Sequence, residues 1–422
     1  MRRIIQATFA ALFLGYSVSS ACAESAWELI VPTLERGDVT SIQVLPGGDL
    51  LVAGSASLST RAFTGAWLAR LSPNGDEVWS KEFLGEAHSQ ISQVLVEQEN
   101  IYLVGSHMVH NPTQADSSGI VAMLSLDGDV RWERWLSERR ASINGASLSK
   151  LSDGSVLVNS VKRPRKGSHR GPHYSKVDAE GEIIWSYTSI PTGTYFEDLP
   201  PLKTWMRDSS GSKIYFESPG PVVEQPNGNI HLYIYRDGVF PGESHIGRCE
   251  VISKRGELLD DEECNQLEHV IGATKAELTP YEIAPVLPGL VLAKQIEVSK
   301  IDGAGDVEWT WTYQTKNRAG LTNAVLTPDG GLIGVGFLIL EDAPKYHRYD
   351  AIVFRLNQQG EEVWSHIYSS ETRDIFADLV ALENDHYAIV GHTGIKASKG
   401  WWDPWIIKID PDGLSESVVS RR

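Results

Sequence analysis

The chain has 422 residues, of which 55 are Asp or Glu and 38 are Lys or Arg, for a net charge of −17 at pH 7. Nucleic-acid binding draws much of its affinity from neutralising phosphates, so this charge argues against a nucleic-acid partner. An anionic membrane surface is disfavoured for the same reason. The length exceeds what one small domain needs, yet no linker or low-complexity tract divides the chain. A single large repeat array would explain both observations.

The first residues have the pattern of an export signal. A short basic segment precedes an apolar run at 4–18, and Ala21-Cys22-Ala23 offers a small-residue cleavage site. The apolar run is too short to span a bilayer comfortably, so an uncleaved anchor is disfavoured. We predict that 1–23 is a signal peptide and that the protein is periplasmic or secreted, with no integral membrane segment. Lipid attachment at Cys22 is an alternative, although Ser19 stands where such signals usually carry Leu.

An eleven-residue pattern recurs along the mature chain. ARLSPNGDEVW at 69–79 returns at 122–132, 175–185, 299–309 and 354–364, each time as an apolar strand, a polar turn ending in Gly, and a Trp four places later. The turn glycines stand 53, 53, 75, 49, 55 and 53 residues apart: Gly75, Gly128, Gly181, Gly256, Gly305, Gly360 and Gly413. This spacing predicts seven repeat units, one of which carries an insertion at about 190–213.

Each unit contains four predicted strands, because short apolar runs are separated by Gly, Asn and Asp turns. Four strands in about fifty residues are typical of a β-propeller blade. The last unit stops at Gly413 without a Trp strand, whereas the mature chain starts with SAWELIV. We therefore predict that 24–422 forms one seven-bladed, all-β propeller, closed by the N-terminal strand so that no sheet edge is left open. An open solenoid is the alternative.

The Trp that follows each turn is predicted to be structural. A large aromatic on an outer strand can pack against the neighbouring blade, where a repeated backbone group would accept its indole N–H. The predicted docking residues are Trp27, Trp79, Trp132, Trp185, Trp309 and Trp364.

The A-x-x-x-x-x-G-x-x-x-W pattern resembles the tryptophan-docking motif of the PQQ-like repeat, which occurs in quinoprotein dehydrogenases and in the outer-membrane assembly scaffold BamB. The resemblance covers most of the mature chain and implies a propeller. Those families usually have eight blades and carry a Thr before the Gly, which is absent here. Their quinone stacks on a vicinal-cysteine ring, and this chain has no vicinal cysteines, so we predict no cofactor. The sialidase Asp-box is a competing pattern, but it places its aromatic three residues after the Gly.

The fourth unit departs from the pattern. Asp260 occupies the position of the docking Trp, and the same hairpin contains Cys249 and Cys264, the only cysteines of the mature chain. Two cysteines this close in an exported protein favour a disulfide, which would stabilise the hairpin in place of the Trp. A plain hairpin would not bring them opposite each other, so a bulge or bend is required.

The long variable segments all join second to third strands and should share one face of the propeller, opposite the short Gly turns. This long-loop face is where we expect function, since variable loops on a rigid scaffold carry most binding sites. A protein partner is the first expectation, because aromatics and Arg are favoured interface anchors. The candidate binding residues are Trp401, Trp402, Arg163, Lys166, His169, Tyr346, His347 and Arg348. His107 and His110 are close enough to share a metal, but loops with scattered histidines make a weak metal site, and a solvated surface is the simpler interpretation of the basic run at 162–170.

The sequence offers little for catalysis. It has no G-x-S-x-G motif and no plausible cysteine nucleophile, and paired carboxylates are common in any acidic chain. The first functional hypothesis is a non-catalytic scaffold that presents the long-loop face to a protein. The alternative is a periplasmic hydrolase or lyase that acts on carbohydrate at the central channel, which convergent carboxylates or histidines would favour.

Overall fold

In the computed structural model, the structure describes residues 26–30, 36–57, 65–83, 88–111, 114–138, 141–164, 169–189, 215–236, 245–259, 281–282, 296–301, 307–340, 349–370, 373–394 and 403–415. These residues form β-strands and short turns, with a single 3-10 turn at Glu383–Asp385. No helix within these ranges is long and apolar enough to cross a membrane. The predicted insertion at about 190–213 lies outside them.

The first three sheets follow one another along the chain, each with four antiparallel strands in sequence order. Blade 1 contains β2 (Arg36–Val44), β3 (Leu50–Ser57), β4 (Gly65–Leu71) and β5 (Glu77–Phe83). Blade 2 contains β6 (His88–Glu97), β7 (Asn100–Asn111), β8 (Gln114–Ser125) and β9 (Val130–Leu136). Blade 3 contains β10 (Ala141–Lys150), β11 (Val156–Pro164), β12 (His169–Val177) and β13 (Ile183–Thr188).

The later sheets repeat this plan with two departures. Blade 4 contains β14 (Tyr215–Glu224), β15 (Ile230–Arg236), β16 (His245–Ile252) and β17 (Leu258–Leu259), and β14 also pairs in parallel with β12 of blade 3. Blade 5 shows β18 (Tyr281–Glu282), β19 (Glu297–Ile301) and β20 (Val307–Thr312). Blade 6 contains β21 (Arg318–Leu326), β22 (Leu332–Ile339), β23 (Tyr349–Leu356) and β24 (Glu362–Tyr368).

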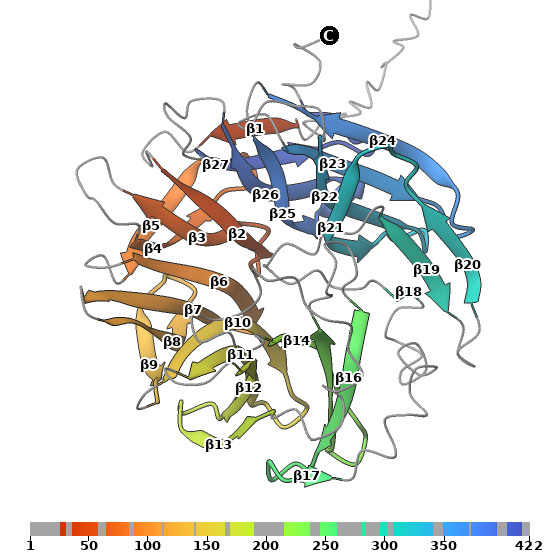
Figure 1. Ribbon diagram of the computed structural model, residues 1–422. Coiled ribbons are helices and arrows are strands. Elements are labelled where there is room, and N and C mark those ends of the chain that lie inside the picture. Colours follow the sequence, from red (N-terminus) through yellow and green to blue (C-terminus); the bar gives the residue numbers. More distant parts are fainter. Residues whose placement is uncertain are drawn as a thin grey trace, which may run out of the picture.

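The two ends of the chain meet in one sheet. Blade 7 contains β25 (Asp374–Ala381), β26 (Tyr387–Thr393) and β27 (Asp403–Ile409), and β1 (Trp27–Ile30) adds its fourth strand. Trp27 pairs with Lys408 and Ile30 with Trp405, and Figure 1 shows β1 beside β27. The predicted all-β fold with closure by the N-terminal strand is confirmed. The seven groups of described strands are consistent with seven blades.

The hydrophobic core lies between blades rather than within them. One cluster joins blades 1 and 2 through residues such as Leu51, Leu68 and Ile101, and another joins blades 6 and 7 through Val353 and Phe376. Similar clusters lie between blades 2 and 3, 3 and 4, 5 and 6, and 7 and 1. The second and third strands bury both faces in this arrangement, which explains why they are almost continuous apolar runs in the sequence.

The inner strands carry a repeated bulge that links neighbouring blades. In blades 1, 2 and 6 the bulged residue is Thr40, Ser92 or Thr322. Its hydroxyl donates to a backbone carbonyl of the next blade, at 2.6 Å for Thr40 to Ile91 and 2.8 Å for Ser92 to Gly145. The bulge also brings backbone against the second strand, so that a Cβ on Gly54 would lie 2.0 Å from the Asp38 carbonyl oxygen. The recurrent Gly of that strand is therefore a packing requirement.

Asp378 occupies the residue after the bulge of blade 7 and joins three blades. Its carboxylate accepts the backbone N–H of Ile42 in blade 1 at 2.9 Å and the side-chain amide of Asn323 in blade 6. Burial raises the pKa of Asp378 to about 6, against the opposing effect of these hydrogen bonds. Both hydrogen-bond donors belong to neighbouring blades, so we assign Asp378 a structural role in holding the ring of blades closed.

Candidate functional site

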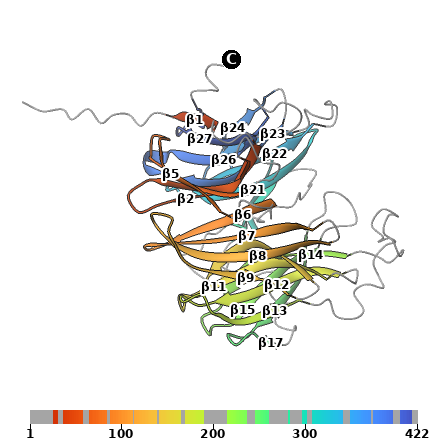
Figure 2. The same ribbon diagram turned by 90° about the vertical axis from the view of Figure 1, so that its left-hand side faces the viewer.

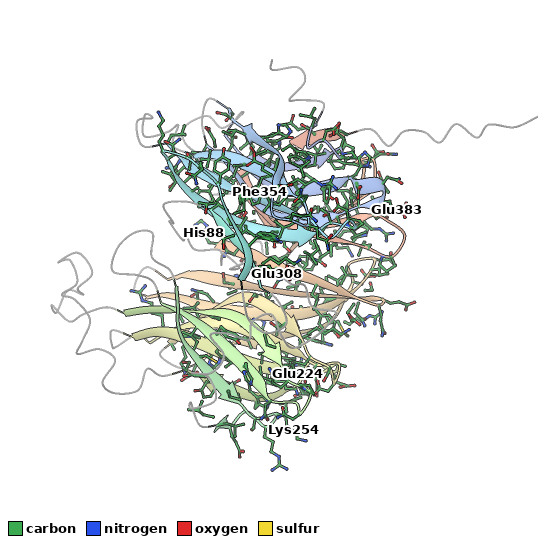
Figure 3. The ribbon with its side chains drawn as sticks, turned by 90° about the vertical axis from the view of Figure 1, so that its right-hand side faces the viewer. His88, Glu224, Lys254, Glu308, Phe354 and Glu383 are labelled. Carbon is green, nitrogen blue, oxygen red and sulfur yellow. The ribbon has the colours of Figure 1, made fainter. Side chains whose placement is uncertain are left out.

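The two faces of the propeller differ in the way the sequence indicates. The short turns after the first and third strands of each blade lie on one face, and the segments after the second and fourth strands lie on the other (Figure 2). His88, at the start of an inner strand, and Glu383, in a short turn, lie on opposite sides of the molecule in Figure 3. We keep the name long-loop face for the side on which the inner strands begin.

The recurrent Trp residues contact the short turn of the following blade. Trp132 donates its indole N–H to the Ala179 carbonyl at 2.9 Å, and its ring lies so close over Gly181 that a Cβ there would come within 2.6 Å of it. Gly181 also needs its positive φ of +83° to close the turn. The same contact is made by Trp27 on Pro73, Trp185 on Lys254, Trp309 on Gln358 and Trp364 on Pro411. The Trp79 ring packs on Gly128, but its buried indole nitrogen has no hydrogen-bond partner among the described residues.

A group of polar side chains lies at the long-loop face where blades 6 and 7 meet. Asp350 is partly exposed near the start of β23, and Ser369 donates its hydroxyl to it at 2.8 Å. Asp374, the first residue of inner strand β25, is 1% exposed. It accepts the Thr393 hydroxyl at 2.5 Å and the backbone N–H of Ser370. These contacts hold the segment between β24 and β25 against the start of blade 7.

The pKa values of the two carboxyl groups in this cluster are both raised. Burial raises the pKa of Asp350, and the hydrogen bond from Ser369 only partly offsets it. Burial also raises the pKa of Asp374, and the negative charge of Asp350 raises it further. Each of the two carboxyl groups therefore takes up a proton at a higher pH than an isolated Asp does.

A cation and a neutral imidazole border the two carboxyl groups. The Arg373 guanidinium lies over the Tyr349 ring, 5.0 Å from its centroid, where the attraction between cation and ring face holds it. His392 is buried in β26. Burial lowers the pKa of His392 to about 3, and the charge of Arg373 adds to the effect. His392 is therefore neutral at every physiological pH.

A second polar group lies at the same face in blade 3. The Lys162 ammonium pairs with Glu138 and lies 3.3 Å from the Thr188 hydroxyl, which in turn contacts His173 Nδ1 at 2.8 Å. Burial lowers the pKa of His173 to about 4, and Lys162 contributes to the shift. The first residue of the predicted basic run is thus bound within the scaffold, whereas Arg163 is exposed and pairs across the sheet with Ser142.

His107 belongs to a third group, at the long-loop end of blade 2. Its Nδ1 lies 2.7 Å from the Ser89 hydroxyl, and its ring meets Trp135 edge to face with centroids 5.5 Å apart. Burial lowers the pKa of His107. The described residues contain no cluster of three or more metal-ligating side chains. His110 lies in β7, but its side chain is outside the described part of the structure.

Most of the other predicted binding residues fall outside the described ranges. Lys166, Tyr346, His347, Arg348, Trp401 and Trp402 all do so, as does Cys264. His169 starts β12, and Cys249 lies in β16 opposite Tyr233. The disulfide and the six loop residues remain predictions. Of the binding candidates, the structure describes the surroundings of Arg163 alone, and it lies in blade 3, apart from the cluster of blades 6 and 7.

The sequence did not single out Asp350, Asp374, Arg373 or Trp135. The two acids are 24 residues apart in an acidic chain, so nothing local marks them. Trp135 had a readable signal, because it stands three residues after a docking Trp where the other blades carry Glu82, Thr188, Thr312 and Ile367. It is 39% exposed and has no docking role.

Comparison with known proteins gives structural likenesses alone. No family model and no curated protein matches the chain. An α-L-arabinofuranosidase from Fusarium graminearum is similar at 9% identity, with a TM-score of 0.44 over 92% of this chain and 96% of that one. A thermostable family-43 glycoside hydrolase is similar at 12% identity, with a TM-score of 0.37 over 82% of this chain and 97% of that one. A puromycin hydrolase is similar at 10% identity, with a TM-score of 0.42 over 86% of this chain and 52% of that one. At these values no residue, substrate or activity is transferred to this chain.

Proposed function

We propose that the protein acts on carbohydrate at the long-loop face and cleaves glycosidic bonds, with Asp350 as the proton donor. The observation that carries this proposal is the pair of neighbouring carboxyl groups with raised pKa values at the junction of blades 6 and 7. Asp350 is accessible, and the hydrogen-bonded Asp374 lies buried beside it. A general acid must be protonated near neutral pH, and burial next to a second carboxyl group is the common way to achieve this.

The proposed step uses Asp350 twice. Its carboxyl proton passes to the glycosidic oxygen as the bond from that oxygen to the anomeric carbon breaks. Water then adds to the anomeric carbon, and the proton that it loses returns to the Asp350 carboxylate. Asp374 is a positioning residue in this scheme, because it is buried and holds the backbone of Ser370, next to the Ser369 that hydrogen-bonds Asp350.

Neighbouring groups suit a sugar ligand. Ser369 and Asp350 offer hydrogen-bonding oxygens, and Arg373 and Tyr349 lie together beside them. The loop that follows His392 and Thr393 carries Trp401 and Trp402, which we propose as stacking platforms for sugar rings. Aromatic faces with a few placed polar groups are the usual composition of a ligand site.

The test is the release of reducing ends from a panel of neutral and acidic polysaccharides. Asp350→Asn should lower kcat by about 100-fold or more, because a positioned general acid contributes at least that much. Its melting temperature should not fall, since the ionised form of Asp350 is disfavoured in the fold. Asp412→Asn is the matched control, because Asp412 is an exposed acid in a short turn on the opposite face.

The outcomes separate the alternatives. Reducing ends without an ultraviolet-absorbing unsaturated product indicate hydrolysis, whereas such a product would indicate elimination and replace the proposed step. A wild-type rate in Asp350→Asn would remove Asp350 as the acid. If no polysaccharide of the panel is bound or cleaved, the proposed function is wrong.

A non-catalytic scaffold for a protein partner is the second candidate, and Trp135 is the observation that favours it. An exposed Trp packed edge to face on a His is a typical interface anchor. Affinity capture with the wild type should then retain a protein that Trp135→Ala fails to retain. Capture that is unchanged by this substitution would count against Trp135 as an anchor.

Three expectations from the sequence complete the proposal. We propose that the chain belongs with the tryptophan-docking repeats, which the indole contacts with the next blade support. We also propose export through the segment 1–23 to a periplasmic or secreted location. Finally, we propose a bridge between Cys249 and Cys264, which mass analysis of the unreduced protein would test.

A further inference from the structure

We propose that the substrate is a polysaccharide and that Trp135, with His107 beside it, binds one of its sugar rings at a distance from the bond that is cleaved. This inference rests on the proposed function, because it assigns a substrate class and a second subsite to the same face. Trp135 and His107 belong to blade 2, whereas Asp350 lies where blades 6 and 7 meet, in a different part of the ring (Figure 1). A ligand that reaches both places must extend well beyond one junction between blades.

Trp135 has an exposed ring that the scaffold does not use. It is the last residue but one of β9, near the end of that strand at the long-loop face, and 39% of it is exposed. The docking contact of blade 2 is made by Trp132, which donates to the Ala179 carbonyl. At the position of Trp135, blade 1 carries Glu82 and blade 3 carries Thr188, so the repeat does not require an aromatic ring there. The indole is therefore available to a ligand.

His107 adds a polar group at the edge of this ring. The two rings meet at 75°, with their centroids 5.5 Å apart. The hydroxyl of Ser89, which is 2% exposed, lies 2.7 Å from His107 Nδ1 and holds the imidazole in one orientation. Within the described part of the chain, His107 Nε2 has no hydrogen-bond partner. That nitrogen can exchange a hydrogen bond with a sugar hydroxyl that lies beside the indole.

The register places a polar row at this junction and at the junction of the proposed proton donor. Each row crosses three strands and begins two residues before the last pair ahead of the bulge. The rows are Ser89, His107 and Ser118 in blade 2, and Asp374, Thr393 and Asp403 in blade 7. Side chains alternate along a strand, so Ser89 faces blade 1 as Ile91 does, and Asp374 faces blade 6 as Phe376 does. Blade 6 carries Ala319 and Leu338 in the first two places, so the repeat does not require polar residues there.

The surroundings of Trp135 favour a sugar ring over a protein surface. Most exposed large apolar side chains of the described residues lie at the starts of outer strands, toward the short-turn face. These are Val78, Val130, Ile183, Ile184, Leu258 and Val363. Trp135 lies apart from them, and the exposed Glu133 and Ser137 are near it in the chain. A protein anchor lies within a larger water-excluding contact, whereas a sugar ring needs one aromatic face and a few polar groups. Trp135 and His107 provide the second arrangement.

The test uses the full chain and the panel of polysaccharides. Affinity electrophoresis measures binding, and kcat and KM are measured for any polysaccharide that is cleaved and for its shortest cleaved fragment. Trp135→Ala should weaken polysaccharide binding and raise its KM by about tenfold with kcat unchanged, because stacking is lost equally from the ground and transition states. The KM of the shortest fragment, which does not reach blade 2, should not change. Trp135→Tyr should retain most of the binding, and His107→Gln should weaken it by about threefold.

Val130→Ala is the matched control, because Val130 is 46% exposed at the opposite end of the same strand. It should bind the polysaccharide as the wild type does. Equal weakening by Trp135→Ala and Val130→Ala, or an equal rise in KM for the polysaccharide and its shortest fragment, would overturn the inference. Loss of a captured protein in Trp135→Ala with unchanged polysaccharide binding would also overturn it and favour the second candidate function.

The subsite and the proposed hydrolysis can fail separately. Cleavage that depends on Asp350 but not on Trp135 would overturn the inference while the proposed function stands. Polysaccharide binding that depends on Trp135, without any cleavage, would support the subsite and reject the hydrolysis. If no polysaccharide of the panel binds, both are wrong.

Discussion

The pKa values of acidic side chains are shifted in opposite directions on the two faces of this propeller. On the short-turn face, Thr327, Gly331 and Arg355 hydrogen-bond Asp329 and lower its pKa. Asp153 is similar, because Lys176 and Ser155 outweigh its partial burial and lower its pKa. On the long-loop face, burial dominates and raises the pKa of Asp350 and Asp374.

The difference shows where the fold stabilises charge and where it does not. A short turn needs an ionised acid to cap its N–H groups and to pair with a cation from the third strand. The long-loop face instead contains neutral His392 and His173 and two carboxyl groups whose pKa values are raised by burial. Titration shifted in the direction of neutrality is typical of sites that transfer protons or select ligands.

The largest expected effect concerns the docking residues of the short-turn face. Trp132→Ala should lower the free energy of unfolding by about 2–3 kcal/mol, since it removes a half-buried ring and its hydrogen bond to Ala179. Trp135→Ala, three residues along the same strand, should cost less than about 0.5 kcal/mol. Urea denaturation of both variants checks this. Equal losses would contradict the division of roles between the two faces.

The next effect is acid sensitivity from the long-loop face. The pKa of His392 is about 3 in the fold, and its ordinary value is 6.5. Between these two pH values His392 is protonated in the unfolded chain but neutral in the folded protein. The contribution of His392 to the free energy of unfolding is complete above pH 6.5 and is lost as the pH falls toward 3. At pH 5 the free energy of unfolding should be about 2 kcal/mol lower than above pH 6.5 because of this group. His392→Gln should remove that part of the slope in a stability curve between pH 7 and pH 5. An unchanged slope would show that His392 can be protonated in the fold.

The smallest effect compares one acid from each face. Asp153→Asn should lower stability by about 1–2 kcal/mol at pH 7, because the Lys176 ammonium is buried and loses its charged partner. Asp350→Asn should leave the melting temperature unchanged or slightly higher, since it removes a carboxylate that the fold disfavours. Thermal unfolding at pH 7 gives both values. A shift of the same sign and size in the two variants would remove the contrast between the faces.

Much of the architecture could be predicted, because the repeat has local signals. The Gly of each turn and the Trp four residues later lie within one hairpin, and their spacing implies the blade. Closure by Trp27 followed from the missing last strand, and the pairing with Lys408 agrees with it. The bulge of the inner strand was not predicted, although the Gly of each second strand, such as Gly54, is its trace in the sequence.

The sequence by itself determined the strands, the repeat and the side on which the long segments lie, because these depend on residues that are near one another in the chain. Only the tertiary structure decided which acids are neighbours. Asp350 and Asp374 come from different blades, and the partners of Asp378 are 55 and 336 residues away. Burial and the charge of a neighbour set a pKa, and both arise only when the blades pack. The two acids proposed for function could therefore be recognised only in the fold.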